Sequence, residues 1–84
     1  MSYSVSILRR AQKELGQISS PGYERVCDAI RALGPSPRPP GCRKLVNREA
    51  WRIRVGVYRV IYEIDDTARA VLVVHVGHRR DVYL

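Results

Sequence analysis

The fold of this chain is decided by residues 51–62, which read WRIRVGVYRVIY. Apolar and cationic residues alternate through the first five positions, and this period of two is typical of a strand with one buried face. The dipeptide Gly56-Val57 then fits a two-residue hairpin turn, since glycine in the first central position suits a type II′ turn. We therefore predict a β-hairpin with a register that sets Arg54 opposite Arg59.

The predicted hairpin has one apolar and one cationic face. The apolar face is expected to be core and consists of Trp51, Ile53, Val55, Tyr58, Val60 and Tyr62. The cationic face carries Arg52, Arg54 and Arg59, with Ile61 beside Arg52. Because like charges directly opposite on a sheet are destabilising, a chain that keeps Arg54 opposite Arg59 most simply has an anion for them. The candidate anion is a phosphate.

Positive charge is concentrated in the same part of the chain. The 84 residues carry a formal net charge of +7, and residues 36–59 contain seven Lys or Arg against one acid, Glu49. Thirteen of the fifteen cations are Arg, whose planar donor fork matches phosphate. Such a patch is typical of an interface for nucleic acid or another polyanion. The alternative is a solvated basic face kept for solubility.

Two helices are predicted before the hairpin, after a short opening strand in which Tyr3, Val5 and Ile7 alternate with serines. Ser20-Pro21 predicts the start of the second helix with Ser20 as N-cap, and Gly34-Pro35 ends it. We expect the helix pair to cover one face of the sheet. The apolar stripes are Leu8, Ala11, Leu15 and Ile18 in the first helix and Tyr23, Val26, Cys27, Ile30 and Leu33 in the second.

The rest of the chain is predicted to be mainly strand. Residues 34–41 are rich in proline and form a stiff connector within the domain. Further strands are predicted near 43–46, at 51–55, at 58–64 and at 70–76, with a turn at 65–68. The predicted fold is α+β, with the order β-α-α-β-β-β-β and an antiparallel-rich sheet, in a single domain over residues 1–84.

The C-terminal residues are the second informative feature. The most buried predicted strand leads through Gly77 to His78, Arg79, Arg80 and Tyr83. Cations and proton-carrying groups of these types can bind and cut a phosphodiester without a metal. The alternative is a frayed basic terminus.

Together these segments resemble the RelE toxins of bacterial type II toxin–antitoxin systems. The resemblance covers essentially the whole chain, and its ordered motifs point to the RelE/ParE fold and, within it, to the RelE branch. The motifs are Arg43-Lys44-Leu45, Trp51-Arg52-Ile53-Arg54, Tyr58-Arg59-Val60-Ile61-Tyr62 and Val76-Gly77-His78-Arg79-Arg80-Asp81-Val82-Tyr83.

The resemblance implies an mRNA interferase, a ribosome-dependent endonuclease that cleaves mRNA in the decoding site and inhibits translation. The ribose 2′-OH would be the nucleophile, and the products would be a 2′,3′-cyclic phosphate and a 5′-OH. No metal or organic cofactor is implied. The implied partners are the ribosome with its mRNA and a cognate antitoxin from the same operon, which would block the toxin.

The resemblance also implies roles for individual residues. Arg52 and Arg54 match two basic strand residues of the active site, Arg59 and Arg79 match phosphate-holding arginines, and Tyr83 matches the aromatic that contacts the substrate. We expect four further cations to add RNA contacts, namely Arg43, Lys44, Arg48 and Arg80.

The chain departs from the RelE pattern at Arg52 and Arg54, where the best-known relatives carry Lys. A desolvated Lys can act as a general base, whereas Arg in practice cannot. His78 and Tyr83 are then the candidate bases, and His, with an ordinary pKa of ~6.5, is the better of the two. Alternatively, the two arginines act only electrostatically.

Two other functions stay open. One is a ParE-like inhibitor of DNA gyrase, although that lineage does not need the five matched residues together. The other is a catalytically degenerate toxin that binds only its antitoxin or RNA.

Several further expectations concern location and metals. The sequence shows no signal peptide, membrane-spanning run or lipidation motif, so a cytoplasmic protein without membrane contact is expected. Cys27 and Cys42 are expected to be free thiols. No metal site is expected, since His75 and His78 would point to opposite faces of a strand.

Overall fold

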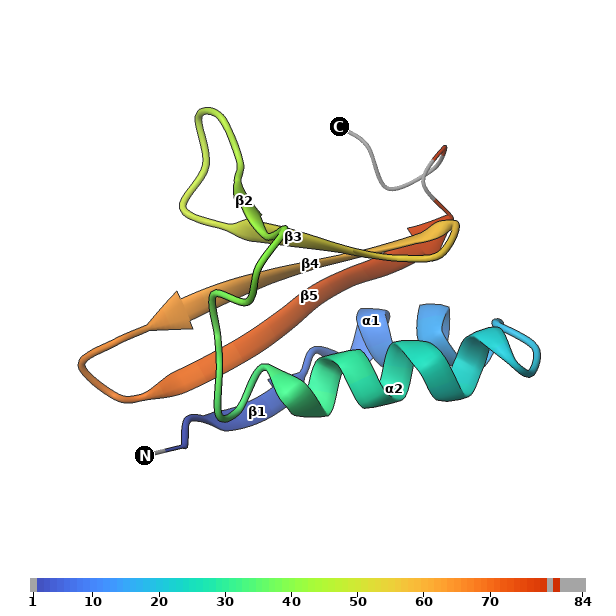
Figure 1. The fold of residues 1–84 in the computed structure, drawn as a ribbon, viewed down its shortest axis with the longest axis horizontal. Coiled ribbons are helices and arrows are strands. Elements are labelled where there is room, and N and C mark those ends of the chain that lie inside the picture. The colour runs from blue at the N-terminus through green and yellow to red at the C-terminus, as the bar shows by residue number, and fades with distance from the viewer. Residues whose placement is uncertain (1, 79, 81–84) are drawn as a thin grey trace.

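The computed structural model describes residues 2–78 and residue 80 as a five-stranded sheet with two helices packed on one side (Figure 1). The elements are β1 (Ser4–Ile7), α1 (Arg9–Gly16), α2 (Gly22–Ala32), β2 (Arg43–Lys44), β3 (Trp51–Val55), β4 (Tyr58–Asp65) and β5 (Ala70–His78). The predicted α+β class and the predicted order of elements are confirmed.

The strands are arranged in the sheet in the order β1-β5-β4-β3-β2. Strand β1 runs parallel to β5, and the other neighbours are antiparallel. A parallel pair needs a long crossover connection, and the helix pair begins that crossover. The pairing with β1 ends at Ile7, opposite Val73, so the next part of β5 has β4 on one edge and no described strand on the other. There the amide of Val76 donates to Glu14 Oε1 on α1 at 2.9 Å, which satisfies a group on the strand edge.

The β3–β4 hairpin has the predicted register. Arg54 lies opposite Arg59, Arg52 opposite Ile61, and Trp51 opposite Tyr62. Gly56 has φ +61°, and the only described non-glycine residues with positive φ are Asn47 and Arg69, outside this turn. The turn therefore has positive φ at Gly56 but not at Val57, which fits the predicted type II′ turn and excludes type I′, where both central residues have positive φ.

The main core lies between the helices and one face of the sheet (Figure 1). The apolar face predicted for the hairpin belongs to this core, with Ile53, Val60 and Tyr62 buried. Two residues of the predicted helix stripes lie outside it, because Leu8 at the N-cap of α1 is 41% exposed and Tyr23 is 40% exposed. The helix residues buried in this core are Ala11, Leu15, Val26 and Ile30, joined by Leu33 at the end of α2.

Of the described segments, one loop covers the other face of the sheet, at one end. After β2 the chain forms a loop over residues 45–50 on the side of the sheet opposite the helices (Figure 1). A second, smaller core forms beneath this loop from the buried residues Ala50, Ile61 and Val74, packed with Leu45 and Leu72. No other described segment covers this face, which carries the arginines.

Two boundaries differ from the prediction. Helix α2 begins at Gly22 with Pro21 in the N-cap position, so Ser20 does not cap it as expected. Instead, the Ser20 hydroxyl donates to the Glu24 carboxylate at 2.7 Å. The strand predicted near residues 43–46 is also shorter, since β2 ends at Lys44 and the Leu45 amide closes the loop on the Ala50 carbonyl at 2.9 Å.

The proline-rich connector is fastened to the sheet by side chains. Both terminal nitrogens of Arg38 donate to the Asp66 carboxylate, at 2.8 and 3.2 Å, and its guanidinium lies 5.0 Å from the centre of the Trp51 ring. The Tyr3 hydroxyl donates to the same carboxylate at 2.6 Å. We call these four residues the Arg38 clasp. Because β2 follows the connector directly, the clasp helps to set its position.

Two expectations about the chain as a whole can be compared with the described residues. None of their helices is long and apolar enough to cross a membrane. Cys27 and Cys42 are free thiols, as predicted, and both are half-buried. Cys27 packs against the main core from α2.

Candidate nucleic-acid interface

The open face of the sheet carries four arginines in two neighbouring rows. In one row Arg54 of β3 lies opposite Arg59 of β4, and in the next Arg43 of β2 lies opposite Arg52 of β3. Each row thus contains a like-charge pair directly across the sheet, which is unfavourable for folding. We call these four residues the arginine cluster. The sequence predicted the first pair, and the second follows from the position of β2.

The arginine cluster lines a cavity of about 750 Å³ between β2, its following loop and the strands β3 and β4. Six of the ten lining residues are cationic, and none is acidic. The four others are apolar or amide residues. The lining residues that the structure describes are Arg43, Lys44, Leu45, Val46, Asn47, Arg48, Arg52, Arg54, Arg59 and Ile61.

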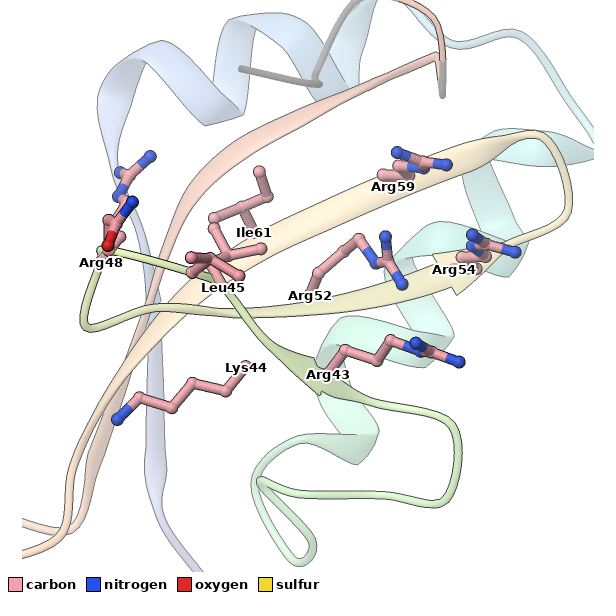
Figure 2. A pocket seen from close by; sticks show the side chains of 10 residues that line it. Arg43, Lys44, Leu45, Arg48, Arg52, Arg54, Arg59 and Ile61 are labelled. Carbon is pink, nitrogen blue, oxygen red and sulfur yellow. The ribbon is translucent and has the colours of Figure 1, made fainter.

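The side chains of the arginine cluster share an orientation. Figure 2 shows all four extending toward the same side of the cavity, although they come from three strands. Lys44 extends away from them, and its ammonium lies 3.2 Å from the Glu49 carboxylate. Arg48 lies on the far side of Leu45 and Ile61 in the same view. Of the cations expected to contact RNA, Arg43 therefore joins the cluster, whereas Lys44 and Arg48 lie at the other end of the cavity.

Burial differs among the arginines and shapes their electrostatic effect. Arg52 is only 8% exposed, Arg59 is half-buried and Arg54 is exposed. A guanidinium keeps its charge in a protein, so the buried Arg52 places a permanent positive charge at the base of the cavity. Charges in a concave site of low dielectric attract an anion more strongly than charges on an open surface. The cavity is therefore suited to bind a phosphodiester.

Arg80 extends the cationic surface at the turn end of the hairpin. It lines a second, smaller cavity of about 400 Å³ together with Gly56, Tyr58 and two members of the cluster, Arg54 and Arg59. Arg80 therefore lies beside Arg54 and Arg59, and its contact with RNA stays a prediction. Arg79 and Tyr83, which were expected in the active site, lie outside the described residues.

His78 does not join the arginine cluster. On β5, Gly77 lies opposite Arg59, so His78 lies opposite Tyr58, whose side chain packs on the main core. The two rings meet edge to face with centroids 6.2 Å apart. His78 also lines a cavity with Glu14 of α1 and Gln17, the residue after that helix, on the side of the sheet that the helices cover. Because side chains alternate along a strand, His78 lies on the face of the sheet opposite to Arg52 and Arg54. It is therefore not beside these two arginines, where a general base for the reaction was expected.

The sequence reasoning missed the apolar part of the cavity. Leu45 and Val46 were expected in a strand, but they belong to the loop after β2 and line the cavity with Asn47. Asn47 has φ +62°, a left-handed conformation that Asn adopts more readily than most residues. Asn47 was the signal in the sequence that could have predicted a loop here, since Asn is common in turns.

Comparison with known proteins identifies the family. Residues 5–83 match the family of ParE toxins of type II toxin–antitoxin systems, the toxins of parDE. The chain belongs to this family. It is therefore a toxin of a type II toxin–antitoxin system, within the RelE/ParE superfamily. No curated protein matches the chain by sequence.

Solved structures of RelE toxins share the fold. The chain is 25% identical to a structure of the archaeal RelE–RelB complex from Pyrococcus horikoshii, with a TM-score of 0.84, covering 98% of this chain and 100% of that one. It is 26% identical to a double arginine-to-alanine mutant of Escherichia coli toxin RelE in the free state, with a TM-score of 0.80 and coverage of 98% and 88%. The RelBE2 toxin–antitoxin complex of Mycobacterium tuberculosis, at 24% identity, has the same fold, with a TM-score of 0.84 and coverage of 94% and 100%.

Proposed function

We propose that this toxin is an mRNA interferase that cleaves mRNA in the ribosomal decoding site. The observation that carries the proposal is the convergence of Arg43, Arg52, Arg54 and Arg59 on one cavity without an acidic residue in its described lining. Such a cavity favours a substrate whose negative charge grows during the reaction. Transesterification of a phosphodiester through a pentavalent phosphorane is such a reaction.

In this reaction the ribose 2′-oxygen attacks the adjacent phosphorus, and the bond from phosphorus to the 5′-oxygen breaks. The 2′-OH loses a proton and the leaving 5′-oxygen gains one, so the products are a 2′,3′-cyclic phosphate and a 5′-OH. Arg59, with Arg79, holds the phosphate, while Arg52 and Arg54 stabilise the charge of the phosphorane. Tyr83 orients the nucleotide.

The described lining of the cavity has no carboxylate, imidazole or phenol to take the proton, and its one lysine, Lys44, is paired with Glu49 away from the arginine cluster. It contains arginine, lysine, aliphatic and amide side chains only. With His78 against Tyr58 on the other face, the arginines act electrostatically, and the 2′-OH loses its proton to a group outside this lining or to solvent. Under this mechanism His78→Asn leaves the cleavage rate within about threefold of wild type, far less than the loss of a general base costs.

The partner of the toxin is a cognate antitoxin that keeps it inactive. The solved relatives from Pyrococcus horikoshii and Mycobacterium tuberculosis are toxin–antitoxin complexes, which supports this part of the proposal. An antitoxin segment that carries acidic residues over the arginine cluster would occupy the place of the RNA phosphates. Binding of antitoxin and of mRNA would then be mutually exclusive.

The test is cleavage of a 5′-labelled mRNA on purified ribosomes whose decoding site is empty. Wild type is compared with Arg59→Ala and with Arg25→Ala, which removes the same charge from an exposed position of α2. We expect a cut within the decoding-site codon, a loss of about 100-fold or more in Arg59→Ala, and near wild-type cleavage in Arg25→Ala. A ribosome-free reaction should give no cut.

Inhibition of DNA gyrase is the second candidate function. The observation that favours it is the match to the family of ParE toxins. The same preparations are therefore added to a gyrase supercoiling assay. Inhibited supercoiling without mRNA cleavage would replace the interferase proposal by this one. A folded protein that does neither and still binds its antitoxin would be a degenerate toxin.

A further inference from the structure

The cavity beside the arginine cluster has an apolar side as well as a cationic one. Leu45 and Ile61 lie between the arginines of the cluster and Arg48 (Figure 2). Ile61 is buried in the small second core, and Leu45 packs against that core from the loop. These two side chains therefore form a fixed apolar surface next to the phosphate-binding groups.

Val46 continues this apolar surface to the rim of the cavity. It is 85% exposed, more than any other large apolar residue that the structure describes, and it lines the same cavity as Leu45 and Ile61. A single exposed valine is ordinary on a protein surface. This one follows Leu45 in the loop and lines the same cavity as Ile61, so its exposure adds to an apolar surface that is already present.

The loop that carries Val46 is held in place at its base. The Leu45 amide donates to the Ala50 carbonyl at 2.9 Å, and Lys44 pairs with Glu49 at 3.2 Å on the same loop. Asn47, at the turn, completes the lining and offers both a hydrogen-bond donor and an acceptor. The loop thus presents an apolar contact and a polar group that could read the edge of a base.

We propose that Leu45, Val46 and Ile61 form a nucleobase subsite, occupied by one unstacked base of a single-stranded RNA whose phosphates lie on the arginine cluster. This inference rests on the proposed function and adds the recognition of a base to it. The occupant follows from complementarity, because a nucleotide combines an anion with a flat, largely apolar base bearing polar edges. A bare phosphate would use only the arginines, and a base inside a duplex could not reach the loop.

The experiment measures equilibrium binding without ribosomes, so that it does not depend on cleavage. Two labelled hexanucleotides of equal charge are titrated with the protein and followed by fluorescence anisotropy. One carries its bases, the other is an abasic backbone, and both are 2′-O-methylated to remove the nucleophile. The variants are Val46→Ser, Arg54→Gln and the control Leu8→Ser, at an exposed apolar residue beyond the cavity lining.

We expect wild type to bind the base-bearing oligonucleotide about tenfold more tightly than the abasic one, at the low end of base-stacking effects. Val46→Ser should lose about threefold to fivefold of the affinity for the base-bearing oligonucleotide and none for the abasic one. Arg54→Gln should weaken both to the same degree. Leu8→Ser should bind both as wild type does.

Distinct results would overturn the two proposals. Equal affinity of wild type for both oligonucleotides, with both weakened in Arg54→Gln, would overturn the base subsite and leave the phosphate site standing. Absence of binding, or no effect of Arg54→Gln, would overturn both. If Val46→Ser binds RNA normally but loses affinity for the antitoxin, the apolar surface belongs to the antitoxin and the base subsite is wrong.

Discussion

Arginines occupy two contrasting environments in this protein. Arg38 is held entirely by the fold, since its guanidinium donates twice to Asp66 and lies over the Trp51 ring. The arginine cluster gathers guanidinium groups from three strands around a cavity whose described lining has no carboxylate. The first arrangement joins parts of the chain that are distant in sequence. The second places like charges opposite each other on the sheet.

The contrast separates arginines that stabilise the fold from arginines that serve a ligand. Arg38 joins the connector to the sheet through its bonds to Asp66, and so contributes to stability. A like charge directly opposite an arginine lowers stability, and an anion bound between the two offsets that repulsion. Substitutions in the two regions should therefore change activity and stability in different combinations.

The largest effect is expected for Arg54→Glu. The substitution converts the pair with Arg59 from like to opposite charges and places a carboxylate where the phosphate would lie. Cleavage of ribosome-bound mRNA should fall by about 100-fold or more, while Tm should rise by a few degrees at most. Cleavage assays and calorimetry on the same preparation measure both, with Arg25→Glu as the matched charge reversal on α2. A Tm several degrees below that of wild type would mean that Arg54 is needed for the fold.

The register of the hairpin could be predicted from sequence because it depends only on local rules. A period of two and a glycine turn fix which residues share a face, and Arg54 and Arg59 follow directly from them. The Arg38 clasp could not be predicted in this way. Arg38 and Asp66 are 28 residues apart, and nothing in either local segment indicates the other.

Two features of β5 show what the sequence could and could not indicate. His78 was grouped with the arginines because it is near them in sequence, yet alternation from Gly77 opposite Arg59 places it on the other face. The alternation of side chains along β5 would have predicted this position, but only once the pairing of β5 with β4 was known. Strand β5 also contains an irregularity: His75 lies opposite Ile61 and Val73 lies opposite Tyr62, so Val74 between them has no residue opposite it. The sequence gives no signal for this extra residue, because it lies in a run of valines and leaves the apolar pattern unchanged.

A smaller effect, on stability alone, is expected for Tyr62→Phe. The fully buried Tyr62 donates its hydroxyl proton to the Pro37 carbonyl at 2.7 Å and so holds the connector beside the clasp. Burial raises the pKa of this phenol, so it stays a donor at ordinary pH. Loss of the bond should lower the free energy of unfolding by about 1–2 kcal/mol in urea denaturation. Tyr23→Phe, at an exposed position of α2, should cost less, and equal costs would show that the bond to Pro37 is unimportant.

A shift of a few degrees in Tm is expected for Arg38→Lys. Lysine keeps the charge but cannot donate two parallel bonds to Asp66 or lie flat on the Trp51 ring. Because the site is partly exposed, the lost pairing is screened by solvent, and the decrease in Tm should be small. Arg25→Lys, the same substitution at an exposed position of α2, should leave Tm unchanged. If Arg38→Lys also leaves Tm unchanged, the clasp contributes nothing to stability.

The smallest effect concerns pH. Hydrogen bonds from Arg38 and Tyr3 lower the pKa of Asp66 from 3.8 to about 2, so its carboxylate is favoured in the folded protein. A lowered pKa contributes stability above the unfolded value, and that contribution is lost as pH falls toward the folded value. The Tm difference between wild type and Asp66→Asn should therefore be constant from pH 7 to about 4 and shrink between pH 4 and 2. Asp28→Asn corrects for the change in net charge, since it removes an acid from the exposed surface of α2. A Tm difference that stays constant down to pH 2 would mean that the clasp does not stabilise the Asp66 carboxylate. Arg38 would then not stabilise the fold through Asp66, and it would no longer differ from the arginine cluster in this respect.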